Sequence, residues 1–125
     1  MPRRATRPLG QWGEETAARF LEARGLRILA RNVRFRLGEI DLIARDGMTL
    51  VVVEVKTRIR GRGDPPQVGV DSRKRMRLTQ LAFSYLTRRR IGEVPSRFDV
   101  VAVTRDPVSG APTVDYFPNA FALDT

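Results

Sequence analysis

The 125-residue sequence predicts a single α/β (α+β) domain, residues 1–125, built on a mixed β-sheet. Two observations support this fold class. Segments with strand-like alternation lie between and after two segments with helical apolar spacing, so the expected order is helix, three or four strands, loop, helix and two strands. The run Leu50 to Val53 is apolar on both faces, which is typical of a central strand.

The N-terminal part is expected to contain a basic arm and then a helix. Residues 1–9 are basic and lack apolar periodicity, and we expect them to form a flexible arm. The segment 10–24 places two alanines and Leu21 on one helical face. Gly25 follows directly and is well placed to end this helix, because glycine adopts the left-handed conformation of a C-terminal cap at little cost.

Three extended segments follow the first helix, at 26–31, 33–37 and 38–45, because apolar and polar residues alternate in each. Asp46-Gly47 is a strong signal for a tight hairpin turn. The most β-prone stretch of the chain, TLVVVEVKTR, returns from that turn.

The second half is expected to hold a loop, a helix and two strands. The segment 59–70 is rich in glycine, proline and arginine, and is predicted to be a mobile loop. Asp71 or Ser72 can cap the next helix. The last two strands are expected in RFDVVAVT and TVDYFPNAFAL. The apolar stripe of the helix consists of Leu78, Leu81, Ala82, Tyr85 and Leu86.

Composition excludes many kinds of functional site. The chain has 23 Lys+Arg against 14 Asp+Glu, a net charge of +9, so we expect an anionic partner, nucleic acid first and an acidic membrane surface second. Because cysteine and histidine are both absent, thiolate zinc sites, histidine-ligated metals and Ser-His-Asp triads are excluded. A metal would be held by oxygen, which favours Mg²⁺, Mn²⁺ or Ca²⁺.

The sequence also bears on location. Its start is basic but has no apolar segment of the secretory type, and no apolar run reaches membrane-spanning length. The absence of cysteine fits a reducing compartment. We therefore expect a cytoplasmic protein without a membrane segment, and association with the nucleoid would fit its charge.

The hairpin brings acidic residues together. A type I′ turn at Asp46-Gly47 would pair Arg45 with Met48. In that register the side chains of one face make Asp41 and Glu54 diagonal neighbours. A longer loop would change the register. The residues expected on this face are Glu39, Asp41, Val52, Glu54 and Lys56.

Carboxylates grouped on one face of a β-prone hairpin repel one another, and a divalent cation would remove the repulsion. Lys56, two residues beyond Glu54, can orient an attacking water or neutralise charge on a phosphate. Such a site can cleave a phosphodiester without histidine. The alternative is an ion-paired, solvated sheet face. The apolar valines that flank these charges favour the functional interpretation.

Two helices add charged residues on their apolar sides. Glu14 lies on the apolar stripe of the first helix. It either completes the acidic site or is only a first-turn glutamate that the helix dipole stabilises. Lys74 lies on the stripe of the second helix and either snorkels to solvent, the slightly favoured alternative, or faces a phosphate. The residues expected to follow a nucleic-acid backbone are Arg58, Arg60, Arg62, Arg73, Lys74 and Arg77.

These motifs resemble a known family. GEE in the first helix, NVRFRLGEIDLIARDG, VVVEVKTR and RFDVVAV resemble the YraN-type family of small bacterial proteins, over about Gly10 to Val103. That family is similar to the PD-(D/E)XK nucleases, which include archaeal-type Holliday-junction resolvases. The resemblance implies a restriction-endonuclease-like domain of three layers, with a mixed central β-sheet flanked by helices.

The resemblance also implies roles for individual residues. Asp41 and Glu54 match the acidic metal ligands of the motif, and Lys56 matches its lysine. Glu14 matches the helix glutamate that completes the site in resolvase-like members. The backbone carbonyl of Val55 matches a further metal ligand.

The two positions before Asp41 depart from the family motif. Ile40 stands where the motif name has proline, an exchange that is common in the superfamily. Glu39 is an additional acid, which either supports a metal ligand from behind or only shapes the end of the strand.

The function implied by the resemblance is a Mg²⁺- or Mn²⁺-dependent DNA endonuclease that is selective for branched or junction DNA. Resolvase-like enzymes of this size are often homodimers, because two cuts need two sites. The alternative is a non-catalytic nucleic-acid-binding protein of DNA repair or recombination with a vestigial site. DNA is favoured over RNA because the sequence lacks the aromatic strand signature of common RNA-binding domains.

Overall fold

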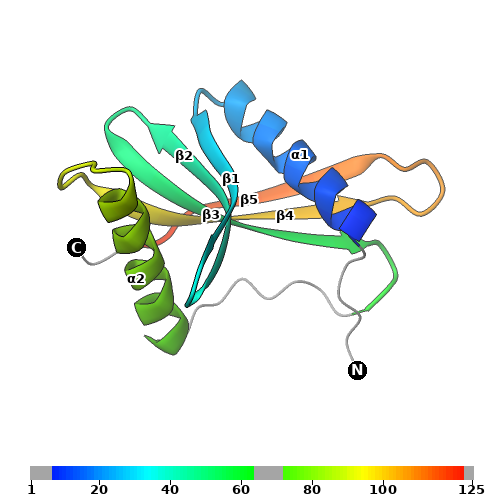
Figure 1. Ribbon diagram of the computed structural model, residues 1–125. Helices are drawn as coiled ribbons and strands as arrows, with labels where there is room; N and C mark the ends of the chain where they lie inside the picture. Colours follow the sequence, from blue (N-terminus) through cyan, green and yellow to red (C-terminus); the bar gives the residue numbers. More distant parts are fainter. Residues whose placement is uncertain (1–6, 64–71, 123–125) are drawn as a thin grey trace.

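The computed structural model describes residues 7–63 and 72–122 of the chain. The elements follow the order that the sequence predicts, with three strands between the helices and two after them (Figure 1). Residues 1–6, most of the predicted loop, and Asp71 lie outside the described residues. The elements are α1 (Arg7–Ala23), β1 (Arg27–Phe35), β2 (Gly38–Asp46), β3 (Thr49–Ile59), α2 (Ser72–Arg88), β4 (Ser96–Arg105) and β5 (Pro112–Ala122).

All five strands form one mixed sheet in the order β1-β2-β3-β4-β5. Consecutive strands pair in antiparallel fashion except β3 and β4, which are parallel because α2 connects them as a crossover. The helices α1 and α2 lie on opposite sides of the sheet (Figure 1). The three-layer α/β fold predicted from the sequence is therefore confirmed.

Each helix buries its apolar stripe on its own face of the sheet. The α1 side packs against Leu42, Val51 and Val53, and the α2 side packs against Val52 and Phe98. The central strand β3 contributes to both layers, as its run of apolar residues predicts. The predicted stripe of α2 is buried in full at Leu78, Leu81, Ala82, Tyr85 and Leu86.

The first helix begins earlier than the sequence analysis placed it. It starts at Arg7, so residues 7–9 of the predicted arm belong to the helix. Pro8 explains the difference, because proline is well tolerated in the first turn, where its missing N–H would have no partner. The helix ends as predicted at Gly25, which has a φ of +95°. The N–H of Leu26 donates to the carbonyl of Leu21 at 3.0 Å, which is the bond of a Schellman cap.

The predicted register of the β2–β3 hairpin is wrong by two residues. Asp46 pairs with Thr49, so Gly47 and Met48 form the turn. Gly47 alone of these two has a positive φ, +60°, which is the pattern of a type II′ turn and not of the predicted I′ turn. A shift by two residues keeps the paired side chains of β2, from Leu42 to Asp46, on their predicted faces. Pairing ends at Leu42 and Val53, so Asp41 and Glu54 are the next residues beyond the last pair, one on each strand.

The two extended segments predicted at 26–31 and 33–37 form one strand, β1. Asn32, with a φ of +51°, lies within β1, and the pairing with β2 shifts between Ile28 and Ala30. Such an irregularity re-aims side chains without ending the strand. No helix in the described ranges has the length and apolar character that crossing a membrane would require.

Candidate functional site

The candidate site lies where β2 and β3 stop pairing. Their last paired residues are Leu42 and Val53, whereas β3 continues beside β4 as far as Ile59. Asp41 Oδ2 lies at the opening and accepts a hydrogen bond of 2.8 Å from the backbone N–H of Val55. The carboxylate thus replaces the strand partner that this N–H would otherwise have. This contact fixes Asp41 against the backbone of the strand that carries Glu54.

The face pattern of β2 also changes at this point. Leu42 and Ala44 face α1, whereas Ile43 faces α2, which is the alternation of a regular strand. Ile40 should share the face of Leu42, yet it packs on the α2 side. The strand therefore turns at Asp41, and that turn opens the sheet.

Glu54 receives two lysines. Lys74 Nζ lies 3.0 Å from Oε1 and 2.7 Å from Oε2, and Lys56 Nζ lies 3.9 Å from Oε1. The Glu54 side chain is 26% exposed, and its Oε2 is buried without a well-directed hydrogen bond. Glu54 Oε2 therefore has a nearby positive charge but no hydrogen bond. A metal cation, which has no preferred bond direction, would suit this oxygen better than another N–H donor.

The prediction that Lys74 snorkels is wrong. Its ammonium bonds to Glu54 on β3 and so belongs to the site. The side chain is 30% exposed, so it keeps one side open to solvent. Helical spacing alone shows which way the residue points but not which acid it meets.

Glu14 reaches the site because α1 approaches β3 without a gap at Gly13. A methyl group on Gly13 would lie 2.0 Å from Thr57 Oγ1, so only glycine fits there. The next residue, Glu14, is half-buried and senses the charges of Asp41 and Glu39. The glycine of the GEE sequence thus has a packing reason, which is the close contact between helix and sheet.

Asn32 is a member of the site that the sequence analysis missed. With its amide nitrogen turned toward the acids, it donates to Glu14 Oε2 at 2.7 Å and to Glu39 Oε1 at 3.2 Å. Its contacts explain the place of Glu39, which is exposed at the edge of the cluster. No signal in the sequence distinguishes this asparagine from a turn residue.

The surroundings of Asp41 and Glu14 raise the pKa of each of these two carboxyl groups. Burial raises the pKa of Asp41 to about 6, and the charges of Glu54 and Glu39 add to this effect, whereas the N–H of Val55 and the charge of Lys74 oppose it. The pKa of Glu14 is also raised, first by burial and then by Asp41 and Glu39. Titratable groups perturbed in this way mark functional sites more often than structural ones.

A cavity of about 160 Å³ lies between the acids and α2. Its floor is apolar and its rim is charged, an arrangement typical of ligand-binding clefts. The rim carries both signs, since Lys74 and Arg77 face Asp41 and Glu54 across it. The apolar residues of the floor are Val52, Leu78, Leu81 and Phe98.

The donor set fits a divalent cation in its chemistry. All ligating atoms are oxygens, Asp41 and Glu54 directly follow the last β2–β3 pair, and Glu54 Oε2 is buried without a hydrogen-bond partner. Within residues 7–63 and 72–122, however, no three acidic side chains are close enough to hold an ion as they stand. A third carboxylate, such as that of Glu14, would have to move inward on binding.

The basic residues predicted to bind nucleic acid are not equivalent. Arg62 and Arg73 are exposed, and Arg77 is exposed at the rim of the cavity. These three are open to an anionic ligand. The other two arginines of the predicted set, Arg58 and Arg60, have different environments.

Arg60 forms an ion pair with Asp106 in the β4–β5 connection. Arg58 is half-buried on β3, and its Nε has no hydrogen-bond partner. Arg58 is therefore less accessible to a phosphate backbone than its place in the sequence indicated, whereas Arg60 is exposed but already paired with an acid.

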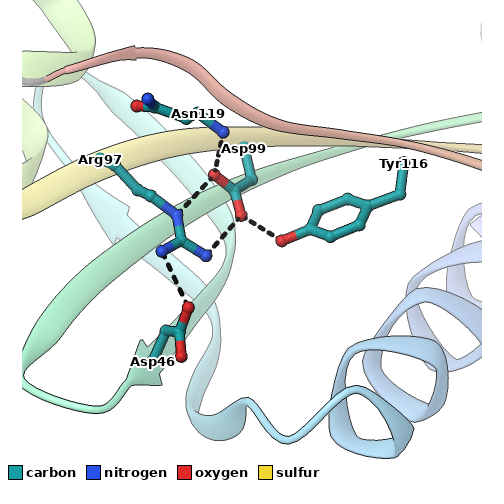
Figure 2. Close-up of polar contacts among 5 residues, drawn as sticks. All are labelled: Asp46, Arg97, Asp99, Tyr116 and Asn119. Atoms are coloured by element: carbon teal, nitrogen blue, oxygen red, sulfur yellow. Dashed lines mark hydrogen bonds and ion pairs between the residues drawn. The ribbon is translucent and has the colours of Figure 1, made fainter.

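A second polar cluster surrounds Asp99 (Figure 2). Asp99 is fully buried and accepts hydrogen bonds from Arg97, from the Tyr116 hydroxyl and from the backbone N–H of Asn119. Arg97 continues the network to Asp46 in the hairpin, at 2.9 Å. The sequence analysis missed this cluster, although the charged Asp99 in the apolar RFDVVAVT was a visible signal.

Comparison with known proteins gives a consistent result. The model of a family described as uncharacterised protein family UPF0102 matches residues 13–103, which include all the site residues named above. A UPF0102 protein of Geobacter metallireducens is 45% identical, over 92% of this chain and 93% of the relative. One of Symbiobacterium thermophilum is 54% identical, over 82% and 86%. One of Acidothermus cellulolyticus is 47% identical, over 94% and 96%.

Proposed function

The chain belongs to the uncharacterised protein family UPF0102, the YraN-type family that its motifs indicated, and we propose that it is a divalent-metal-dependent endonuclease acting on DNA. The single observation that carries this proposal is the convergence of Asp41 and Glu54 where β2 and β3 part, with Lys56 beside them. Branched or junction DNA is the proposed substrate, in a cytoplasmic or nucleoid-associated setting.

The proposed roles follow from the contacts. Asp41 and Glu54 hold Mg²⁺ or Mn²⁺, and Glu14 joins them by moving inward. The Val55 backbone is fixed at the same place by its hydrogen bond to Asp41, so its carbonyl remains the proposed further ligand. A bound cation would supply positive charge to polarise a phosphate and favour deprotonation of a water.

Lys56 is proposed to act on the reacting groups directly. Its Nζ lies 3.9 Å from Glu54 Oε1, close enough for attraction and too far for a hydrogen bond, so its three N–H donors are not used up by that acid. An ammonium in this position can hold an attacking water or neutralise a developing charge on phosphate.

The net charge of +9 and the exposed Arg62, Arg73 and Arg77 support nucleic acid as the substrate. The acids would otherwise repel a phosphate backbone, so cations on both sides of them are needed. DNA is proposed over RNA on the grounds given by the sequence. A homodimer is part of the proposal only as the arrangement that would allow paired cuts.

A second candidate is a non-catalytic protein that binds nucleic acid. One observation favours it. Glu54 is already neutralised by Lys74, and no three acids in the described residues are poised for an ion. A site that has lost its metal-binding function is expected to have its remaining acids in ion pairs, as Glu54 is.

The test is a cleavage assay on labelled single-stranded, duplex, flap and four-way-junction DNA, with one RNA, in Mg²⁺, Mn²⁺ or chelator. We expect metal-dependent cleavage, with the highest rate on branched DNA. Asp41→Asn and Lys56→Met should each lower the rate by about 100-fold or more. Asp115→Asn and Arg45→Met, which change exposed residues away from the site, are the matched controls and should cleave normally.

The outcome decides between the two candidates. Firm salt-sensitive binding without cleavage of any substrate would favour the non-catalytic protein. Cleavage that survives both Asp41→Asn and Lys56→Met would mean that the activity comes from another site or from a contaminant.

A further inference from the structure

Lys74 occupies a position that helix stability does not explain. It lies in the first turn of α2, which contains no acidic residue and carries Arg73 and Arg75 beside it. The N-terminus of a helix has a partial positive charge, so cations there are unfavourable by about 0.3–1 kcal/mol each. A lysine kept at this end needs a compensating partner, and Glu54 provides it.

The contact between the two residues is of an unusual kind. One ammonium lies within hydrogen-bonding distance of both oxygens of one carboxylate, at 3.0 and 2.7 Å. Its charge also acts on Asp41, where it lowers the pKa against the larger raising effect of burial. Lys74 therefore serves the same two acids that are proposed to hold the metal.

The Lys74 ammonium does not satisfy all the carboxylate oxygens of Asp41 and Glu54. Glu54 Oε2 has Lys74 Nζ at 2.7 Å but no well-directed hydrogen bond, because the geometry favours Oε1. Lys56 and Lys74 both lie against Glu54, whereas Asp41 and Glu14 each lie near other carboxylates, with Arg31 opposing this at Glu14. A divalent cation carries twice the charge and has no preferred bond direction, so it would satisfy the same oxygens better.

We propose that Lys74 is a built-in counter-ion that holds Glu54 while the site lacks metal, leaves it when a divalent cation binds, and then contacts a phosphate of the nucleic acid. This inference rests on the proposed function, because the cation is the one that the nuclease would use.

The destination of the displaced lysine is already present. Lys74 lines the rim of the cavity beside Arg77, and its four-carbon stem lets the ammonium swing without moving the helix. A phosphate at the rim would attract Lys74 and so release Glu54 for the cation. By linkage, the cation would release Lys74 for the phosphate to the same extent. Metal and nucleic acid should therefore bind with positive coupling.

The first experiment measures Mn²⁺ binding to the full chain by calorimetry without nucleic acid. Lys74→Met should bind Mn²⁺ more tightly than wild type, by roughly 5- to 100-fold. Lys74→Gln serves as a second variant in case the first folds poorly. Arg77→Met is the matched control, because it removes one positive charge from the same cavity rim but no contact with Glu54. It should change the affinity by less than about threefold, as expected of a partly screened charge.

The second experiment measures the coupling. Mn²⁺ affinity is determined with and without a saturating junction oligonucleotide whose phosphorothioate linkages slow cleavage. Wild type should bind Mn²⁺ at least about fivefold more tightly with the oligonucleotide present. In Lys74→Met that ratio should fall toward one, whereas Arg45→Met, a change at an exposed residue away from the site, should keep it.

The outcomes separate this inference from the proposed function. If wild type binds Mn²⁺ and Asp41→Asn abolishes the binding, but Lys74→Met binds no more tightly than wild type, the counter-ion role is wrong and the nuclease proposal stands. An equal gain in Arg77→Met would also overturn it, because general electrostatics would then suffice. Failure of both wild type and Lys74→Met to bind Mn²⁺ at millimolar concentrations would overturn both proposals.

Discussion

Asp99 and Asp41 are both acids at places where the pairing of the sheet is interrupted, but they are treated in opposite ways. Asp99 lies where the β4–β5 register shifts, between Phe98 and Val100, and Asp41 lies where β2 and β3 part. Asp99 accepts hydrogen bonds from three residues, whereas Asp41 has one from a backbone N–H and faces other acids. Figure 2 shows how closely the donors surround Asp99.

The difference separates two uses of a carboxylate. A buried acid whose oxygens are all satisfied stabilises the fold, since its charge is balanced at close range. An acid that is half-buried, short of donors and close to like charges is costly in the folded state unless a ligand arrives. By this criterion the Asp99 cluster is structural, and the acids around Asp41 are prepared for a cation.

The largest effect is expected at the satisfied acid. Asp99→Ala removes the acceptor of Arg97, Tyr116 and the Asn119 N–H, and leaves the half-buried Arg97 guanidinium only partly paired. We expect the free energy of unfolding to fall by about 3–5 kcal/mol, measured by urea denaturation. Asp115→Asn, an exposed acid on β5, is the control. A loss of less than 1 kcal/mol for Asp99→Ala would mean that Asp99 does not stabilise the fold, and the proposed difference from Asp41 would be wrong.

The next effect tests the packing that brings Glu14 to the acids. Gly13→Ala places a methyl group 2.0 Å from Thr57 Oγ1, so α1 must move away from β3. We expect a loss of roughly 2–3 kcal/mol and weaker Mn²⁺ binding. Gly10→Ala is the matched control in the same helix. Nothing lies within 4 Å of a Cβ there, so it should stabilise the protein by about 0.5–1 kcal/mol.

The unsatisfied acid should behave in the opposite sense. Asp41→Asn removes a charge whose pKa is raised to about 6 in the folded state, mainly by burial, while its oxygen can still accept from Val55. We expect a gain of about 2 kcal/mol at pH 7.5, measured by urea denaturation without metal.

The pH dependence of this gain follows from the sign of the pKa shift. Because the folded protein binds the Asp41 proton more tightly than the unfolded chain, this residue makes wild type lose stability as pH rises from about 4 to about 6. The gain in Asp41→Asn should therefore vanish near pH 4. A gain that is equal at both pH values would show that Asp41 is not under electrostatic stress.

The smallest effect removes one donor from the satisfied acid. Burial and the Asp99 carboxylate raise the pKa of Tyr116 to about 12, so its hydroxyl donates at any physiological pH. Tyr116→Phe should cost about 1–1.5 kcal/mol, because Arg97 and the Asn119 N–H remain. The ring should keep its edge contact with Phe20. Addition of Mn²⁺ should shift the melting temperature of this variant as much as that of wild type.

Most of the fold was accessible from the sequence because local signals and burial agree. The stripe of α2 and the central strand β3 were predicted because apolar periodicity records which side faces the core. The hairpin register was missed because Gly47 serves equally well at the first position of a II′ turn and at the second position of a I′ turn. The start of α1 was missed because Pro8 permits a helix there without signalling one.

The acids of the site could be predicted from the sequence because charged residues interrupt strands that are otherwise apolar. Asp41 and Glu54 stand out for this reason, and Asp99 carries the same signal, which was not used. The Lys74 contact was not accessible, since it depends on how α2 docks over β3. The role of Asn32 depends on the side-chain orientation at an irregular strand position, which no spacing rule specifies.

The order of the chain has a consequence for synthesis on the ribosome. Every acid of the cluster lies between Glu14 and Glu54, on elements that contact one another locally, whereas Lys74 comes 20 residues after Glu54. The N-terminal half can thus assemble its hairpins before α2 and β4 have been translated. A nascent chain at that stage would expose an acidic cluster beside an uncovered apolar face. The newly emerging α2 would then cover both at once, with its leucines on the face and Lys74 on the acids.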